Sequence, residues 1–272
     1  MYNVAADTAH FAVERLTGHH MALLEAGRWE ATVARIGVER EGEHPLDAIL
    51  AWPEPTHDDE RFPAIILLPD IFGVRPLFDD IAHRIATNGW CVIAPEPFSR
   101  IPRKKREHMD IDARFAAMPD LVDSQQLSDI KACAAYLEAM PECDGHTPGL
   151  IGFCAGGYYA FKAAQAGVAS AVVSFYGMLR TPPAWDGPGH YGPLDSEPAQ
   201  TPTLAWFGSL DPWVPAEDVR RFAATWRRPH RSVTIEGADH GFVHDPDRPA
   251  HRAQDAAYCW EESLRWLRDP AE

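Results

Sequence analysis

The segment from Gly152 to Gly156 combines residue types and a spacing that could support nucleophilic catalysis. It reads Gly-Phe-Cys-Ala-Gly and stands between an apolar run and a segment of helical character. Where a strand turns sharply into a helix, small residues on either side let the two approach, and the central side chain projects from the turn. The start of a helix favours a thiolate, so Cys154 is the candidate nucleophile. A buried, unreactive cysteine at a tight turn fits the same motif.

Two further residues have the types that activate such a nucleophile. A nucleophile needs a base, and the base needs an acid to orient it. Asp211 and His240 come after Cys154 in that order, each directly after an expected strand. Nucleophile, acid, histidine is one of the orders in which catalytic triads occur. Asp239 is the alternative acid, but neighbours in sequence rarely orient each other's side chains, so Asp211 is favoured.

The elements expected around these residues alternate between strands and helices. The apolar run 64–68 is typical of a strand buried on both faces. Alternation of this kind favours the α/β class, with a mostly parallel sheet and helices on both faces. Ligands of such sheets lie beyond the carboxyl ends of the strands, where the three residues are expected to meet. The expected strands are 31–38, 46–52, 64–68, 90–94, 149–153, 170–175, 203–207 and 232–236, and the expected helices are 77–88, 124–140, 156–166, 216–226 and 251–267.

Three segments lie outside this alternation of strands and helices: an N-terminal extension and two loops. Residues 9–26 are expected to be helical, so we divide the chain into a helical extension, residues 1–30, and one domain, residues 31–272. Residues 99–119 are expected to form a basic, irregular loop. Residues 182–202, rich in Pro and Gly, are expected to form a second loop that faces the site.

Composition and charge limit the classes of partner. The 272 residues include 25 basic and 40 acidic side chains, a net charge of −15. Such acidity disfavours binding to nucleic acid and to anionic membranes, since both require basic surface. Five cysteines without a CxxC pair predict neither a disulfide framework nor a structural zinc site. Because there is also no signal-peptide pattern and no long apolar stretch, we expect a cytoplasmic protein.

Six motifs along the chain occur together in a combination that is specific. They are Pro-Asp-Ile-Phe-Gly-Val at 69–74, Ala-Pro-Glu-Pro-Phe-Ser-Arg at 94–100, Ile-Gly-Phe-Cys-Ala-Gly-Gly at 151–157, Phe-Tyr-Gly at 175–177, Gly-Ser-Leu-Asp-Pro-Trp-Val-Pro at 208–215 and Ala-Asp-His-Gly-Phe at 238–242. From about residue 36 to residue 267, the chain resembles the dienelactone hydrolase family. The resemblance implies an α/β-hydrolase fold.

The resemblance also implies a catalytic apparatus. Its nucleophile, base and acid are Cys154, His240 and Asp211. Its oxyanion hole consists of the backbone N–H groups of Ile71 and Ala155. The second donor agrees with the turn itself, because the residue after the nucleophile supplies one oxyanion N–H in such turns.

Four residues are expected to bind substrate or to activate the thiol. By resemblance, Arg100 binds the carboxylate of an acidic lactone, a partner that a guanidinium can hold bidentately. Tyr176 belongs to this group through its motif. Asp70 stands where family members carry a glutamate that helps to deprotonate the thiol, and its side chain is one methylene shorter. His244 stands where a carboxylate-binding arginine is expected, and a neutral imidazole makes a weaker contact.

These residues predict an ester hydrolase that acts through an acyl-enzyme, above all on a lactone that carries a carboxylate. The expected partner is this small molecule, no cofactor or metal is expected, and the oligomeric state stays open. The first alternative is a general carboxylesterase or thioesterase for neutral acyl groups, which His244 favours. The second is a ligand-binding relative without activity, against which the intact triad argues.

Overall fold

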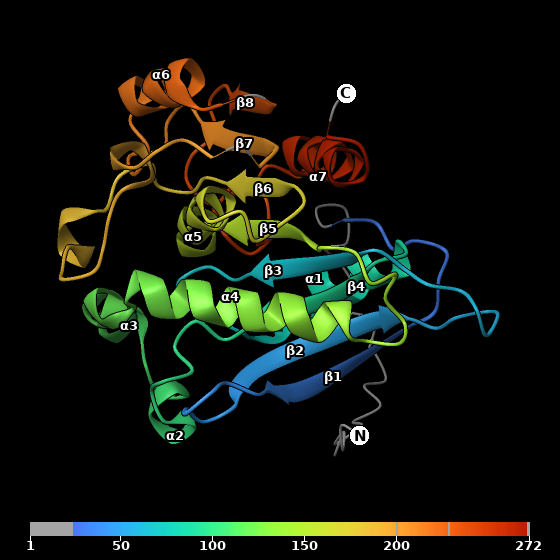
Figure 1. The fold of residues 1–272 in the computed structure, drawn as a ribbon. Helices are drawn as coiled ribbons and strands as arrows, with labels where there is room; N and C mark the ends of the chain where they lie inside the picture. The colour runs from blue at the N-terminus through green and yellow to red at the C-terminus, as the bar shows by residue number, and fades with distance from the viewer. Residues whose placement is uncertain (1–23, 200, 228, 271–272) are drawn as a thin grey trace.

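The computed structural model describes residues 24–199, 201–227 and 229–270, which form one eight-stranded sheet flanked by helices (Figure 1). The strands are β1 (Ala31–Val38), β2 (Leu46–Pro53), β3 (Ala64–Leu68), β4 (Cys91–Pro95), β5 (Gly149–Phe153), β6 (Val172–Phe175), β7 (Thr203–Gly208) and β8 (His230–Ile235). The α-helices are α1 (Pro76–Thr87), α2 (Arg103–Arg106), α3 (Ile111–Ala117), α4 (Asp123–Glu138), α5 (Ala155–Gln165), α6 (Ala216–Thr225) and α7 (Ala253–Arg268), and the short 3₁₀ turns are η1 (Met118–Asp120), η2 (Pro183–Trp185) and η3 (Pro193–Asp195). The predicted α/β class is therefore confirmed.

The strand order brings distant chain segments to one edge of the sheet. The order is β1-β2-β4-β3-β5-β6-β7-β8. Strands β3 to β8 pair in parallel, whereas β1 and β2 run antiparallel to their neighbours. The carboxyl ends of the parallel strands consequently lie at the same edge, which is on the left in Figure 1. The segments that follow β3, β5, β6, β7 and β8 start from this edge.

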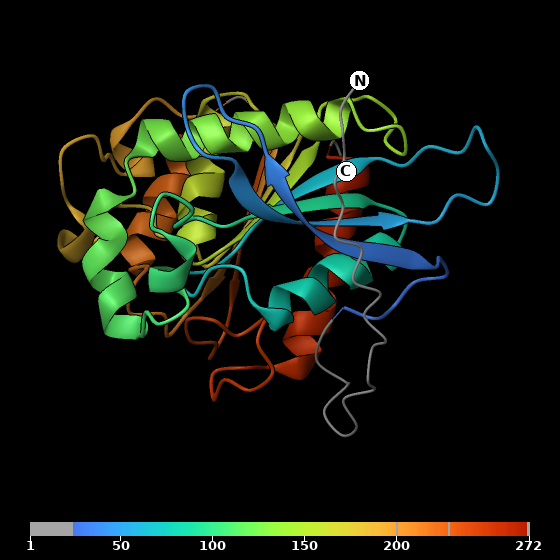
Figure 2. The ribbon, with the colours of Figure 1, turned by 90° about the horizontal axis from the view of Figure 1, so that it is seen from below.

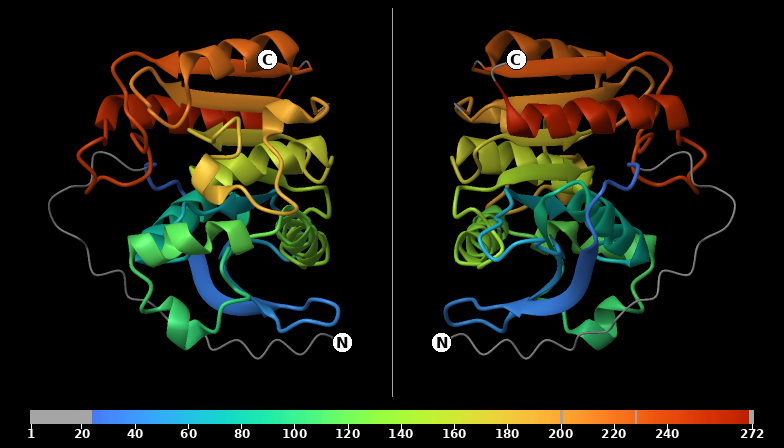
Figure 3. Two further views of the ribbon diagram at one scale, coloured as in Figure 1. Left: turned by 90° about the vertical axis from the view of Figure 1, so that its left-hand side faces the viewer. Right: turned by 90° about the vertical axis from the view of Figure 1, so that its right-hand side faces the viewer.

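Helices cover both faces of the sheet. Figure 2 shows α4 on one side, and α1 and α7 on the other. Helix α5 lies beside α4, and α6 continues this layer through the contact of Phe161 with Phe222, whose ring centroids are 5.3 Å apart. The two views in Figure 3 show α5 against one face of the central strands and α7 across the other. Both faces of the central strands are thereby shielded from water.

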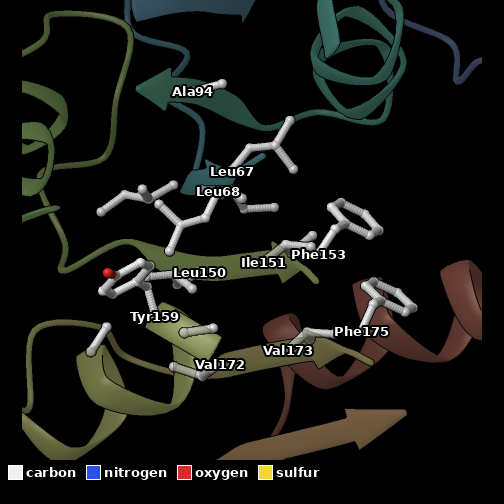
Figure 4. Packing of buried hydrophobic residues seen from close by; sticks show 14 of the residues in the cluster. Leu67, Leu68, Ala94, Leu150, Ile151, Phe153, Tyr159, Val172, Val173 and Phe175 are labelled. Atoms are coloured by element: carbon white, nitrogen blue, oxygen red, sulfur yellow. The ribbon is translucent and has the colours of Figure 1, made fainter. Parts of the chain in front are cut away.

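The central strands carry mainly apolar side chains because neither face meets solvent. Every residue of β3, β5, β6 and β7 is buried. Phe153 and Phe175 stack with ring centroids 4.8 Å apart, and they point away from Tyr159 of α5 (Figure 4). Trp260 of α7 packs on both rings, at 5.6 and 5.5 Å. Burial of each such side chain contributes about 1.5–3 kcal/mol, so the ends of β5 and β6 are held firmly.

The segment expected to be an irregular basic loop contains regular structure. It forms α2, α3 and η1, and the carboxylate of Asp110 caps the start of α3 by accepting the Ala113 N–H at 2.8 Å. The expectation was wrong here because such short helices carry too few apolar positions for a periodic pattern. The available signal in the sequence was Asp110 itself, because aspartate is a preferred residue at the start of a helix.

The expected N-terminal helix lies outside the described residues, except for its last three positions. Residues 24–26 are described and are not helical. The Leu24 side chain is buried, and its carbonyl accepts a hydrogen bond of 3.0 Å from Arg84. This stretch therefore packs on α1. In the described part of the chain, no helix has the length and apolar character needed to cross a membrane.

Candidate active site

Cys154 stands in a strained backbone conformation between β5 and α5. Its φ is 53° and its ψ is −114°, which L-residues rarely adopt and which costs about 1–3 kcal/mol. The two flanking glycines allow this turn. A Cβ added to Gly152 would lie 2.2 Å from the Gly156 carbonyl oxygen, and one added to Gly156 would lie 2.2 Å from that of Leu68. The turn therefore presents Cys154 at the carboxyl edge of the sheet.

His240 is held by Asp211 across 29 residues of sequence. The distance from His240 Nδ1 to Asp211 Oδ2 is 2.9 Å. The other carboxylate oxygen, Oδ1, accepts the N–H of Trp213 at 2.8 Å, which orients the acid. The alternative acid, Asp239, accepts the backbone N–H of His240 at 2.6 Å and does not bond the ring. The ring is therefore oriented by Asp211.

Electrostatics join His240 to Cys154. Burial opposes the charged imidazolium, but the charge of Cys154, with hydrogen bonds to Asp211 and Cys154, outweighs burial and raises the pKa of His240 to about 10. The Cys154 side chain is thus close enough to interact with the ring. The imidazole of His240 therefore interacts with the Asp211 carboxylate on one side and with the Cys154 side chain on the other.

Ile71 and Ala155, the expected oxyanion donors, line one cavity. The cavity has a volume of about 20 Å³, enough for a water molecule, and lies beyond the ends of β3 and β4. Ala155 is the first residue of α5, so its N–H is free of any partner within the helix. Ile71 belongs to the loop of residues 70–74, which we call the oxyanion loop. Ile71 and Ala155 therefore border the same small cavity.

Glu96, a residue to which sequence reasoning assigned no role, holds the oxyanion loop. Its Oε2 accepts the Val74 N–H at 2.9 Å, and its Oε1 accepts the Phe98 N–H at 3.1 Å. Gly73 adopts a φ of +69°, and a Cβ there would lie 2.7 Å from both carboxylate oxygens. The available signal in the sequence was an acidic residue directly after an expected strand.

Arg100 has partners other than a substrate. Its Nη1 lies 2.7 Å from Oδ2 of Asp129 and its Nη2 lies 2.9 Å from Oδ1, while its Nε lies 2.9 Å from Glu43. A bidentate carboxylate on one side and a second acid on the other already occupy the guanidinium. A substrate carboxylate would have to displace Asp129 or Glu43.

Asp70, His244 and Tyr176 meet in the interior. The distance from Asp70 Oδ2 to His244 Nε2 is 2.7 Å, and His244 Nδ1 is hydrogen-bonded to the Tyr176 hydroxyl. All three residues are buried, with exposed fractions of 0–1%. Both ring nitrogens of His244 thus have protein partners, so no nitrogen is left for the substrate carboxylate that this position was expected to meet.

The acceptor positions of the Asp70 carboxylate are also occupied. Arg75, which sequence reasoning missed, donates to Oδ1 at 2.6 Å and to Oδ2 at 3.0 Å, and the Phe72 N–H donates to Oδ1 at 3.0 Å. With His244, these bonds use the roughly four acceptor positions of a carboxylate. The expected activation of the Cys154 thiol by Asp70 therefore lacks a free acceptor position.

Among the residues that the structure describes, no cluster of three or more histidine, cysteine, aspartate or glutamate side chains is arranged to hold a metal ion. His240 and His244, whose spacing resembles that of metal ligands, instead bond Asp211 and Asp70.

The parallel sheet, the strained turn after β5 and the acid and histidine after β7 and β8 define an α/β-hydrolase. The chain belongs to the dienelactone hydrolase family, whose model matches residues 46–270. This membership makes the protein a hydrolase of carboxylic esters.

Individual relatives agree with this membership. A Synechocystis sp. protein provisionally assigned as a carboxymethylenebutenolidase is 30% identical over 215 residues, which cover 74% of this chain and 84% of the relative. A Bradyrhizobium sp. protein, also provisionally assigned, is a 2-oxo-3-(5-oxofuran-2-ylidene)propanoate lactonase by its description. It is 30% identical over 237 residues, which cover 86% of this chain and 92% of the relative. The crystal structure of a provisionally assigned dienelactone hydrolase from Klebsiella pneumoniae superposes with a TM-score of 0.77 at 26% identity, covering 88% of this chain and 99% of that one.

Proposed function

We propose that the protein hydrolyses esters and lactones through an acyl-enzyme formed on Cys154. The observation that carries the proposal is the 2.9 Å contact of His240 Nδ1 with Asp211, combined with the interaction between His240 and Cys154 at the strained turn. A nucleophile, a base and an orienting acid in this relation support covalent catalysis.

The reaction begins with attack of the Cys154 thiolate on the ester carbonyl. The new C–S bond pushes an electron pair onto the carbonyl oxygen, which the N–H groups of Ile71 and Ala155 stabilise. As the oxyanion collapses, the C–O bond breaks, and protonated His240 gives its proton to the leaving alkoxide. His240 then takes a proton from water, which attacks the thioester. Collapse of this second oxyanion breaks the C–S bond and releases the acid.

We further propose that the substrate is a lactone that carries a carboxylate. Support comes from the Bradyrhizobium relative, which is assigned as a lactonase, and from the carboxymethylenebutenolidase assignments of other relatives. In a lactone the leaving alkoxide remains attached to the acyl group, so a single opened product leaves after hydrolysis of the thioester.

A second candidate is hydrolysis of neutral esters, which the surroundings of the triad favour. Arg100 is paired with Asp129 and Glu43, and His244 is buried with both nitrogens bonded. Trp213, two residues after the acid of the triad, is 44% exposed, and its ring lies 6.0 Å from that of Phe115. These rings offer an apolar wall to a neutral acyl or alkoxy group.

One set of assays tests both proposals. The wild type and Cys154→Ala are compared on a carboxylate-bearing lactone and on a neutral aryl ester, with mass spectrometry of the quenched enzyme. We expect turnover to vanish in Cys154→Ala and a mass increase equal to the acyl group in the wild type. Turnover unchanged in Cys154→Ala would refute the nucleophile. The ratio of kcat/KM for the two substrates decides between the candidates.

We also propose that the enzyme acts in the cytoplasm on small molecules. All five cysteines are free thiols, which is typical of proteins in a reducing compartment. The net charge of −15 disfavours nucleic acid and anionic lipid as partners.

A further inference from the structure

A hydrogen-bonded chain of a carboxylate, an imidazole and a hydroxyl lies beside the proposed catalytic residues. It runs from Asp70 through His244 to the hydroxyl of Tyr176, and Arg75 holds its acidic end with two hydrogen bonds. The proposed mechanism uses none of its side chains. Three buried polar groups in one chain carry a large desolvation cost, so their hydrogen bonds must be complete.

The protonation state of this chain follows from its partners. Burial acts against ionisation of Asp70, but His244 and Arg75 hold the pKa of its carboxyl far below the usual range. Burial lowers the pKa of His244, so the imidazole is neutral. Nε2–H of His244 therefore donates to the Asp70 carboxylate, and Nδ1 accepts the hydroxyl proton of Tyr176. Each residue has one defined hydrogen-bonding role.

The chain joins the two loops that carry the proposed oxyanion donor Ile71 and the proposed base His240. Asp70 opens the oxyanion loop, whose Ile71 is a proposed oxyanion donor. His244 stands four residues after His240. Arg75 adds a contact between the same two loops, because its Nη2 lies 3.5 Å from Asp245. The relative position of oxyanion donor and base thus depends on contacts within this chain.

Tyr176 brings the chain into contact with the catalytic base. Its ring lies edge-on to the ring of His240, with centroids 5.1 Å apart and planes at 63°. Its backbone has a φ of 41°, a strained value for a tyrosine, directly after β6. Its N–H donates to the carbonyl of Trp206 at 2.8 Å. Strand pairing fixes one end of Tyr176 and the hydroxyl bond to His244 fixes the other.

We propose that Tyr176 is a positioning residue, held by His244 and Asp70, that sets the orientation of His240 against Cys154. The inference rests on the proposed function. The edge of an aromatic ring packed against an imidazole restricts the rotation of that imidazole. The hydroxyl bond to His244 keeps the Tyr176 ring in that place.

The first test is Tyr176→Phe, which removes the hydroxyl and retains the ring. We expect kcat on the proposed ester substrate to fall about tenfold, which corresponds to about 1.4 kcal/mol at the transition state, while KM changes by less than about twofold. We also expect alkylation of Cys154 by iodoacetamide, followed on its peptide, to require a pH about one unit higher. A residue that only stabilised the fold would leave this pH dependence unchanged.

Tyr158→Phe is the matched control, because this buried hydroxyl also bonds protein partners, Thr181 and the carbonyl of Tyr191. We expect wild-type kcat and a wild-type alkylation profile. Wild-type values in Tyr176→Phe, or equal losses in both variants, would overturn the inference.

The second test exchanges His244. In His244→Gln the amide can still donate to Asp70 and accept from Tyr176, so we expect kcat within about threefold of wild type. In His244→Leu both bonds are lost, and kcat should fall by more than about tenfold. Equal losses in both variants would overturn the inference.

Failure of the proposed function can be distinguished from failure of the proposed role of Tyr176. Turnover that survives in Cys154→Ala refutes the proposed function. A Cys154→Ala variant without turnover, combined with wild-type behaviour of Tyr176→Phe, refutes only the role of the buried chain.

Discussion

The carboxylate of Asp211 lies 2.9 Å from Nδ1 of His240, while its other oxygen accepts the N–H of Trp213. One acid thus orients the imidazole and is itself oriented by the turn that follows β7. Asp239, adjacent to His240 in sequence, bonds only the backbone N–H. The contact explains why the distant acid and not the neighbouring one can set the tautomer of the ring.

Replacement of Asp211 tests this contact directly. In Asp211→Asn the amide no longer stabilises the imidazolium and can favour the wrong tautomer, so we expect kcat to fall by about 10²–10⁴. Asp239→Asn serves as the comparison, with an expected loss below tenfold. Steady-state kinetics on a neutral aryl ester provide the measurement. Similar losses in the two variants would contradict the assignment of the acid.

The raised pKa of His240 predicts a pH-dependent contribution to stability. Despite the opposing effect of burial, Cys154 and Asp211 raise the pKa to about 10 from an ordinary value of 6.5. Because the folded state holds this proton more tightly than the unfolded state, the stabilisation is complete below pH 6.5 and is lost as the pH rises towards 10. Urea unfolding should show the difference between the wild type and His240→Gln shrinking over this range. A difference that stays constant from pH 6 to 10 would contradict the prediction.

Arg100 is expected to contribute to stability through Asp129. That carboxylate has a side chain only 4% exposed, and Arg100→Ala leaves it with Arg40 as its cationic partner, at 3.1 Å. We expect the free energy of unfolding to fall by about 1–3 kcal/mol. The control is Arg103→Ala, since the side chain of Arg103 is 78% exposed and its pair with Glu107 should contribute about 0–1 kcal/mol.

The same Arg100→Ala variant separates the structural role from substrate binding. If Arg100 also binds a substrate carboxylate, KM for the acidic lactone should rise much more than KM for a neutral ester. Equal effects on the two substrates would leave only the structural role.

Gly156 is expected to tolerate no side chain. A Cβ there would lie 2.2 Å from the carbonyl oxygen of Leu68, a backbone atom that cannot move without shifting β3. We expect Gly156→Ala to lower the free energy of unfolding by more than about 3 kcal/mol, or to yield no folded protein. Gly167→Ala is the control. Gly167 has a positive φ, of +64°, but no atom lies within 4 Å of its added Cβ, so the expected cost is about 1 kcal/mol. Comparable losses of stability in the two variants would contradict the prediction that the close contact at Gly156 decides.

Local sequence patterns were sufficient for most of the fold. Uninterrupted apolar runs such as residues 64–68 and 149–153 identify strands because burial on both faces excludes polar side chains. The short helices α2 and α3 escaped prediction because each has a single buried residue and therefore no periodic apolar pattern. The strand order, with β4 between β2 and β3, has no local signal, since it depends on how crossovers pack.

In the candidate site, too, some features follow from the sequence and others only from the tertiary structure. The sequence by itself determined the types and order of Cys154, Asp211 and His240, because a sharp turn and a triad demand particular residues at particular strand ends. Only the tertiary structure decided the partners of Arg100, Asp70 and His244. Ion pairs and buried hydrogen bonds form between side chains far apart in sequence, and Asp70 and His244 are 174 positions apart. Which acceptor a buried donor finds depends on the packing of the whole sheet, and residue spacing does not encode it.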